Sequence, residues 1–165
     1  MEPIRIALLP MYVALYDTSS PHMRPEIEAF AQRIAGSLQT RGLEVLSAPV
    51  CRLQEEFAQA IRTFEQSGAE AIVTLHLAYS PSLESAKPLS QTELPLIVLD
   101  TTPDYLFDTT VSSDRLMYNH GIHGVQDMCN LLVRNGKPFA IFAGHAEHSD
   151  VLDRVAAAAR AAAIW

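Results

Sequence analysis

The sequence is short of cysteine, with only Cys51 and Cys129 among 165 residues. The two lie far apart and form no Cys-x-x-Cys pair, so we expect reduced, buried thiols of a cytoplasmic protein rather than a disulfide scaffold. Basic residues are also scarce: 12 Lys and Arg stand against 19 Asp and Glu, a net charge of −7. Nucleic acid and anionic membranes, which require a basic face, are therefore not expected partners.

Long apolar runs and phosphate-binding glycine motifs are missing too. The apolar stretch at residues 6–16 has 11 residues, too few to span a bilayer, and predicts a buried strand with an exit loop. Neither GxxxxGK[ST] nor GxGxxG occurs, and no GxSxG elbow or Cys/His pairing indicates a covalent nucleophile. Where a phospho-acceptor Asp would follow the third strand, this chain has His76.

What the sequence does contain is a regular alternation of strand-like and helix-like segments. The short apolar runs typical of buried strands are residues 4–9, 43–46, 71–75, 96–99 and 139–142. The helical patterns between them lie at residues 25–41, 52–66 and 125–133, with a short helix expected in 81–91 and an Ala-rich helix from Asp150. Such alternation predicts one three-layer α/β/α domain over residues 1–165, with a five-stranded parallel sheet in the flavodoxin-like order 2-1-3-4-5.

Histidines gather where this fold would bind ligands, at the carboxyl ends of the strands. His76 follows the third strand, His145 the fifth, and His120 and His123 stand at the entry to the fourth long helix. A loop histidine is more often a structural or exposed residue than a ligand. For the His120–His123 pair the two interpretations weigh about equally, because Gly121 and Gly124 indicate a close backbone approach at a helix N-terminus. Two histidines without a third ligand are a weak indication of a metal site.

Four segments, taken in order, resemble the N-terminal domain of the L-arabinose/L-fucose isomerase superfamily along essentially the whole chain. Residues 15–17 (LYD) are similar to the family's Leu-Tyr-Gly after the first strand. Residues 76–81 (HLAYSP) resemble its His-Thr-Phe-Ser-Pro with one insertion. Residues 119–124 (NHGIHG) are similar to its Asn-Gln-x-x-His-Gly, and residues 144–146 (GHA) to its Gly-His-Trp.

The resemblance implies that Leu15, Tyr16 and His123 contact a sugar, with His120 in the place of the family's Gln. In many members these segments reach the active site of a neighbouring subunit, which implies a homo-oligomer. An imidazole in place of an amide changes a fixed donor and acceptor into a group that titrates near neutral pH. Ala146 in place of Trp removes a large packing surface.

The resemblance also implies a reaction. The family interconverts an aldose and its ketose through an ene-diol, with a divalent metal, usually Mn²⁺, and carboxylates that later domains supply. We therefore expect no catalytic or metal-binding residue in this chain, whose part would be substrate contact and assembly. Two alternatives stay open: a free-standing, non-catalytic sugar-binding or assembly domain, and another small-molecule enzyme of this fold that uses the histidine loops directly.

Overall fold

The computed structural model describes residues 3–164 and contains one sheet of five parallel strands in the order β2-β1-β3-β4-β5. This pairing confirms the predicted flavodoxin-like strand order. The strands are β1 (Ile4–Met11), β2 (Leu43–Ser47), β3 (Ala71–His76), β4 (Leu96–Asp100) and β5 (Phe139–Ala143).

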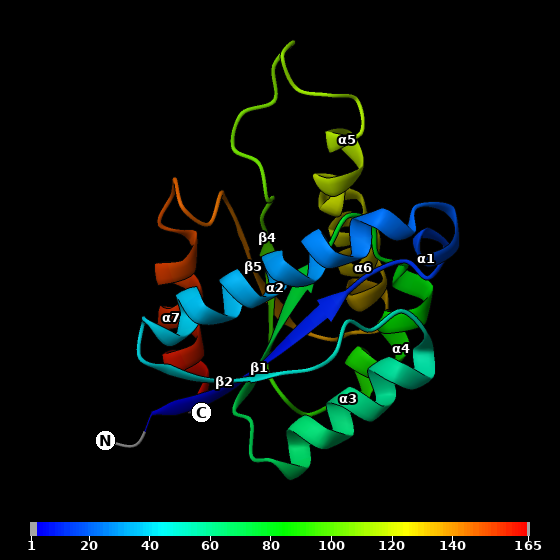
Figure 1. The fold of residues 1–165 in the computed structure, drawn as a ribbon. Helices are drawn as coiled ribbons and strands as arrows, with labels where there is room; N and C mark the ends of the chain where they lie inside the picture. Colours follow the sequence, from blue (N-terminus) through cyan, green and yellow to red (C-terminus); the bar gives the residue numbers. More distant parts are fainter. Residues whose placement is uncertain (1–2, 165) are drawn as a thin grey trace.

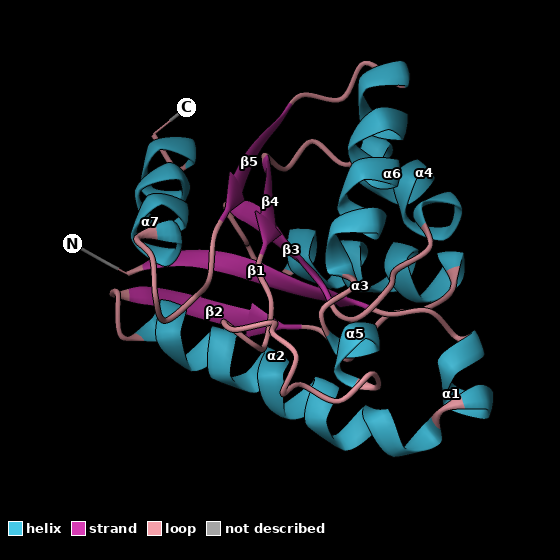
Figure 2. Ribbon diagram, turned by 90° about the horizontal axis from the view of Figure 1, so that it is seen from above, coloured by secondary structure: helices cyan, strands magenta, loops and turns pink. Residues whose placement is uncertain are grey.

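Helices cover both faces of the sheet and complete the three layers (Figures 1 and 2). On one face lie α2 (Arg24–Gln39) and α7 (Val151–Ala162). On the other lie α3 (Gln54–Gln66), α4 (Ser82–Gln91) and α6 (Gly121–Arg134). Within residues 3–164, none of the helices is both long and apolar enough to cross a membrane.

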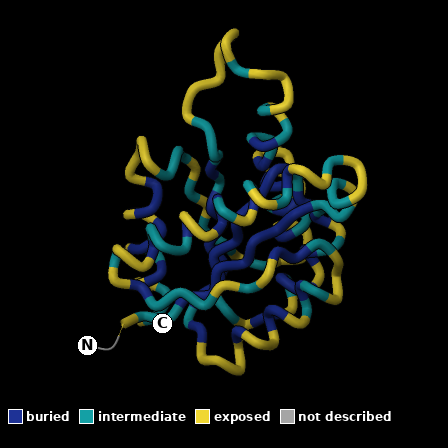
Figure 3. Tube along the Cα trace, in the orientation of Figure 1, coloured by how far each residue is buried: buried dark blue, intermediate teal, exposed yellow. Residues whose placement is uncertain are grey.

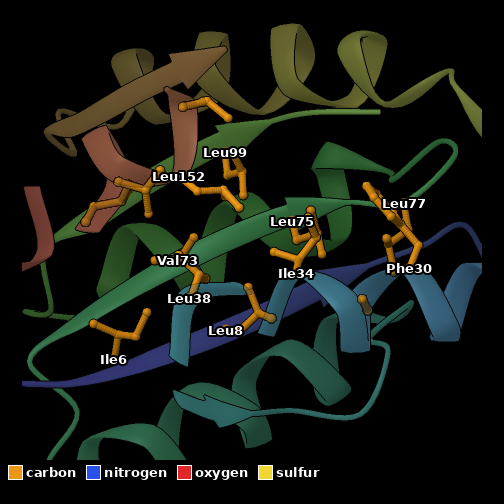
Figure 4. Close-up of a cluster of buried hydrophobic side chains, with 14 of the residues drawn as sticks. Ile6, Leu8, Phe30, Ile34, Leu38, Val73, Leu75, Leu77, Leu99 and Leu152 are labelled. Carbon is orange, nitrogen blue, oxygen red and sulfur yellow. The ribbon is translucent and has the colours of Figure 1, made fainter. Parts of the chain in front are cut away.

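The core follows from the two-residue period of the central strands, which are buried on both faces. In β1, Ile6 and Leu8 belong to the cluster beneath α2 and α7, while Ala7 and Leu9 belong to the cluster beneath α3 and α6. Figure 4 shows Ile6 and Leu8 with their neighbours from α2, β3 and α7. Buried segments accordingly run through the middle of the molecule and exposed ones surround it (Figure 3).

Strand β1 is longer than the apolar pattern predicts, because it continues through Pro10 to Met11. Proline lacks an N–H, yet the Pro10 carbonyl accepts a hydrogen bond from the Cys51 N–H at 2.9 Å. Met11 still pairs with His76 of β3 and forms a bridge to Cys51. The strand therefore brings the residues after Met11 well beyond the end of β2.

Leu15 and Tyr16, expected in a loop, lie in the short helix α1 (Leu15–Ser19). A 3₁₀ turn (Pro21–Met23) follows and leads into α2. A second short helix, α5 (Arg115–Tyr118), stands near the carboxyl end of β4 (Figure 1). Helices of four or five residues are too short to show a 3.6-residue apolar period, so the sequence pattern could not reveal them.

Phe57 offers a test of the core, since its side chain is fully buried between α3 and the sheet. We expect Phe57→Ala to lower the free energy of unfolding by about 3–5 kcal/mol, because it removes apolar contacts and leaves a cavity. Leu83→Ala is the control, since Leu83 is 79% exposed and should change stability by less than about 0.5 kcal/mol. Urea unfolding followed by circular dichroism measures both, and equal effects would contradict this packing.

Candidate functional site

The candidate site lies at the carboxyl edge of the sheet, where β1 and β3 are neighbours. From β1 the chain crosses to β2 on one side, and from β3 it crosses to β4 on the other. The connections therefore diverge at this point, and open α/β sheets bind ligands in the crevice that such a divergence leaves. The segments that follow β1 and β3 begin at this edge, and the start of α6 packs on the loop after β3.

The β1 side of the site carries Tyr12, Leu15 and Tyr16. Tyr12 is fully buried and meets the ring of Tyr16 edge-on, with centroids 5.8 Å apart. Burial, and next the negative charge of Asp17, raise the pKa of Tyr12 to about 12, so this phenol stays neutral. Leu15 is 63% exposed and stands at the outer rim. Tyr12 is thus a core residue that supports Tyr16.

Helix α1 is too short to be stable by itself, and ion pairs hold it in place. The Asp17 carboxylate accepts hydrogen bonds from Arg24 at 3.0 Å and from Arg52 at 2.6 Å. Burial alone would raise the pKa of Asp17, but these two guanidinium groups outweigh it and lower the pKa. Arg52 also pairs with Glu56 of α3 at 2.7 Å, so the network ties α1 to α2 and α3.

The β3 side begins with a buried pair, His76 and Ser80. The Nδ1 atom of His76 lies 2.6 Å from the Ser80 hydroxyl, and both side chains are buried. Removal from water lowers the pKa of His76 to about 3, so the ring is neutral at any physiological pH. His76 is therefore a structural residue that fixes the loop after β3, not an acid or base that reaches solvent.

The two glycines of α6 are explained by this loop and not by a ligand. A Cβ atom on Gly121 would lie 2.8 Å from the His76 carbonyl oxygen. A Cβ atom on Gly124 would lie 2.5 Å from the Ser80 hydroxyl and 2.8 Å from the Ser80 carbonyl oxygen. The helix backbone therefore packs directly on the loop and seals the His76–Ser80 hydrogen bond. The close backbone approach that the glycines predict is present, but the helix approaches the loop from His76 to Ser80 and not a ligand.

That packing places His120 and His123 beside Tyr79. The two imidazole centroids are 4.1 Å apart, and the Tyr79 ring is 6.1 Å from that of His120. Partial burial, and then the charge of His123, lower the pKa of His120, which favours the neutral ring. The Tyr79 hydroxyl donates to the Asp127 carboxylate at 3.2 Å.

Tyr16 completes this group from the β1 side. Burial, the hydrogen bond to Asp127 and the nearby Tyr16 raise the pKa of Tyr79. The structure thus groups Tyr16, Tyr79, His120 and His123 at the position where an open α/β sheet has its binding crevice, with Leu15 on the same short helix as Tyr16.

Two members of the group, Tyr79 and Asp127, were not among the predicted site residues. Asp127 follows His123 by four residues, one turn along α6, which the sequence could have indicated. Tyr79 lies in the segment 76–81 that the resemblance includes, but its contact with His120 depends on the packing of α6 on the loop after β3.

The predicted strand-end residue His145 and its neighbour His148 do not belong to this group. His145 and His148 follow β5 and contact Tyr105, at the β4 and β5 end of the sheet edge. His22 lies in the 3₁₀ turn before α2.

The site does not match the ligand set of a divalent metal. Within residues 3–164, no group of three His, Cys, Asp or Glu side chains lies close enough to hold a metal ion. His120 and His123 form a pair, while stable protein sites for Mn²⁺ or Zn²⁺ require at least three side-chain ligands. What the crevice offers is phenol and imidazole groups, which donate and accept hydrogen bonds without a fixed charge.

A hollow of about 830 Å³ lies elsewhere, between β2 and α3. Its walls are mainly apolar. Of its four charged members, Arg52 is paired with Glu56 and Arg24 with Asp17 and Glu28. We assign the functional site by the convergence of polar groups at the sheet edge, because size alone supplies no chemistry.

Comparison with known proteins adds no family to this description. No protein-family model matches the chain, and no curated protein matches it with significance. The isomerase resemblance therefore stays a prediction from the residues, and the fold and the site geometry are what the structure adds to it.

Gly124 offers a direct test of the contact between α6 and the β3 loop. We expect Gly124→Ala to lower the free energy of unfolding by about 1–3 kcal/mol, because the new methyl group overlaps Ser80. Gly36→Ala is the matched control, since a Cβ there meets no described atom within 4 Å and the change should stabilise α2 by about 0.5–1 kcal/mol. Thermal and urea unfolding give both values, and a stabilising Gly124→Ala would contradict the packing.

The pKa of His76 makes stability depend on pH in a defined direction. Its folded pKa of about 3 lies below the ordinary 6.5, so the unfolded chain binds a proton that the folded chain does not. The contribution of His76 is complete above pH 6.5 and is lost as pH falls towards 3; between pH 7 and 5 the loss is about 2 kcal/mol.

NMR provides the measurement for this prediction. The His76 ring signals should stay fixed from pH 8 to pH 5 in the folded protein and should shift in urea. A folded-state transition near pH 6 would refute the burial argument.

Proposed function

We propose that the chain is the substrate-contacting and oligomer-forming domain of an aldose–ketose isomerase of the L-fucose/L-arabinose type. In this proposal Leu15, Tyr16, His120 and His123 contact the sugar. The Mn²⁺ or other divalent metal and the carboxylates that move the proton lie outside the residues described here. The domain binds and orients the substrate, and in a homo-oligomer it serves the active site of a neighbouring subunit.

One observation supports this proposal above the others. The resemblance assigns sugar contacts to two segments about 100 residues apart, 15–16 and 120–123, and both lie at the divergence of β1 and β3. Tyr79 lies between them, close to His120 and within electrostatic reach of Tyr16. Packing of the core does not require polar rings at the divergence of β1 and β3. We therefore take ligand binding as the reason for their common position.

The chemistry of these groups suits a neutral polyol better than an anion. A neutral imidazole offers one donor and one acceptor, and phenols offer both, so each matches a sugar hydroxyl, which also donates and accepts. Asp127 lies beside Tyr79 and would repel a phosphate or carboxylate. The half-exposed rings and Leu15 provide apolar surface for the C–H face of a sugar.

The alternative is a sugar-binding or assembly domain that takes part in no reaction. The same crevice would serve it equally well, since sugar contact and catalysis use different residues in our proposal. Isomerase activity of the complete gene product distinguishes the two. A screen of aldoses with Mn²⁺ that yields ketose supports the isomerase, while sugar binding without turnover supports the alternative.

His123 is the residue on which to test the proposal. In the complete gene product we expect His123→Ala to lower kcat/KM for the preferred aldose about tenfold, the effect of one lost hydrogen bond, without unfolding the domain. His22→Ala is the matched control, because His22 is an exposed histidine of the 3₁₀ turn and takes no part in the ring contacts of His120, His123 and Tyr79. Steady-state kinetics and a thermal melt of each variant give the answer. Wild-type kinetics in His123→Ala would remove His123 from the substrate site.

A further inference from the structure

A second group of rings lies at the other end of the same sheet edge and has no part in the proposed site. The connections after β4 and β5 and the start of α5 enclose a groove of about 570 Å³. Figure 1 shows the connection after β4 extending well beyond the rest of the molecule before it returns to α5. The residues that determine the chemistry of the groove are Asp104, Tyr105, Ser112, His145, Glu147 and His148.

Three rings in this groove form a preformed stacking platform. Tyr105 stacks on His148 with centroids 4.1 Å apart and an interplanar angle of 26°. His145 meets Tyr105 edge-on at 5.3 Å. Tyr105 remains 58% exposed, so part of its ring is accessible to a ligand.

His145 adds a hydrogen-bond donor that lacks an acceptor. Its Nδ1 atom accepts the backbone N–H of Glu147 at 3.2 Å, so in the neutral ring the hydrogen stands on Nε2. The Nε2 atom is buried and has no partner among residues 3–164. A buried donor without an acceptor is costly, but an atom closed to solvent does not contact a ligand in the groove. His145 therefore contributes to the groove through its ring contact with Tyr105.

In the wall that carries Asp104, the guanidinium group of Arg115 is already bonded to carboxylates. Arg115 donates to the Asp104 carboxylate at 2.7 and 2.8 Å, and its remaining terminal nitrogen donates to Glu26 at 2.6 Å. Asn119 holds Asp104 from a third direction at 2.6 Å. The guanidinium hydrogen bonds lower the pKa of Asp104, which therefore stays a carboxylate.

This charge arrangement decides the class of ligand. A phosphate or carboxylate would meet Asp104 and the exposed Glu147, while the guanidinium of Arg115 is already shared between Asp104 and Glu26. An aromatic platform beside hydroxyl groups and carboxylate acceptors suits an uncharged molecule with a C–H face and several hydroxyl groups.

We propose that the groove between the β4 and β5 connections is a second binding site, for the ring of a neutral monosaccharide. The C–H face of the sugar stacks on Tyr105, and sugar hydroxyl groups donate to the carboxylates of Asp104 and Glu147. The site shares no residue with the β1/β3 crevice, so the inference does not depend on the proposed function.

The test uses the 165-residue chain labelled with ¹⁵N and titrated with L-fucose and L-arabinose up to about 100 mM. We expect amide shifts at residues 104–112 and 144–149 that saturate in the millimolar range. Tyr105→Ala should weaken this binding about tenfold, and Tyr105→Phe, which keeps the ring, should retain it. Glycerol, which has hydroxyl groups but no ring face, serves as the matched probe.

The titration tests the two sites independently of each other. Shifts at the groove that persist in His123→Ala and vanish in Tyr105→Ala support the second site, whatever happens at the crevice. Shifts only at the crevice support the proposed function and overturn the second site. Groove shifts that glycerol or inorganic phosphate reproduces, or that survive Tyr105→Ala, overturn it too.

Discussion

The contact between the N-terminus of α6 and the end of β3 determines much of the arrangement at the sheet edge. Only glycine permits it, because a Cβ atom at Gly121 or Gly124 would overlap the backbone of the loop from His76 to Ser80. The contact excludes water from the His76–Ser80 hydrogen bond and turns His76 into a neutral, structural group. It also fixes His120 and His123 next to Tyr79, since all three positions are set by where α6 begins.

Burial, more than residue type, separates the histidines of this edge into different roles. His76 loses all contact with water, and its pKa falls so far that it cannot exchange protons near neutral pH. His120 is only partly covered, so its ring is biased towards the neutral form yet stays within reach of a ligand. The same residue type therefore has two roles at this edge. The buried His76 supports the loop after β3, and the partly exposed His120 belongs to the polar surface of the candidate site.

The sequence was sufficient for the fold because each strand is buried on both faces and each long helix shows a clear apolar period. Residues such as Leu8, Leu9 and Phe57 indicate the layers directly. The sequence was insufficient for segments whose position depends on polar or aromatic partners far away in the chain. Helix α1 depends on Asp17 and on arginines from two other elements, and Tyr105 meets His148 only after both connections fold.

The same limit explains why only part of the candidate site was predicted. Leu15, Tyr16, His120 and His123 could be named because local motifs carry them, but a motif does not say what a glycine approaches. Gly124 could equally have faced a ligand, and the structure shows Ser80 there. With that position filled by the protein, a ligand can approach only over the side chains of the rim. A sugar bound there would contact rings and hydroxyls, not the backbone N–H groups of α6, and binding should tolerate changes of charge less well than changes of size.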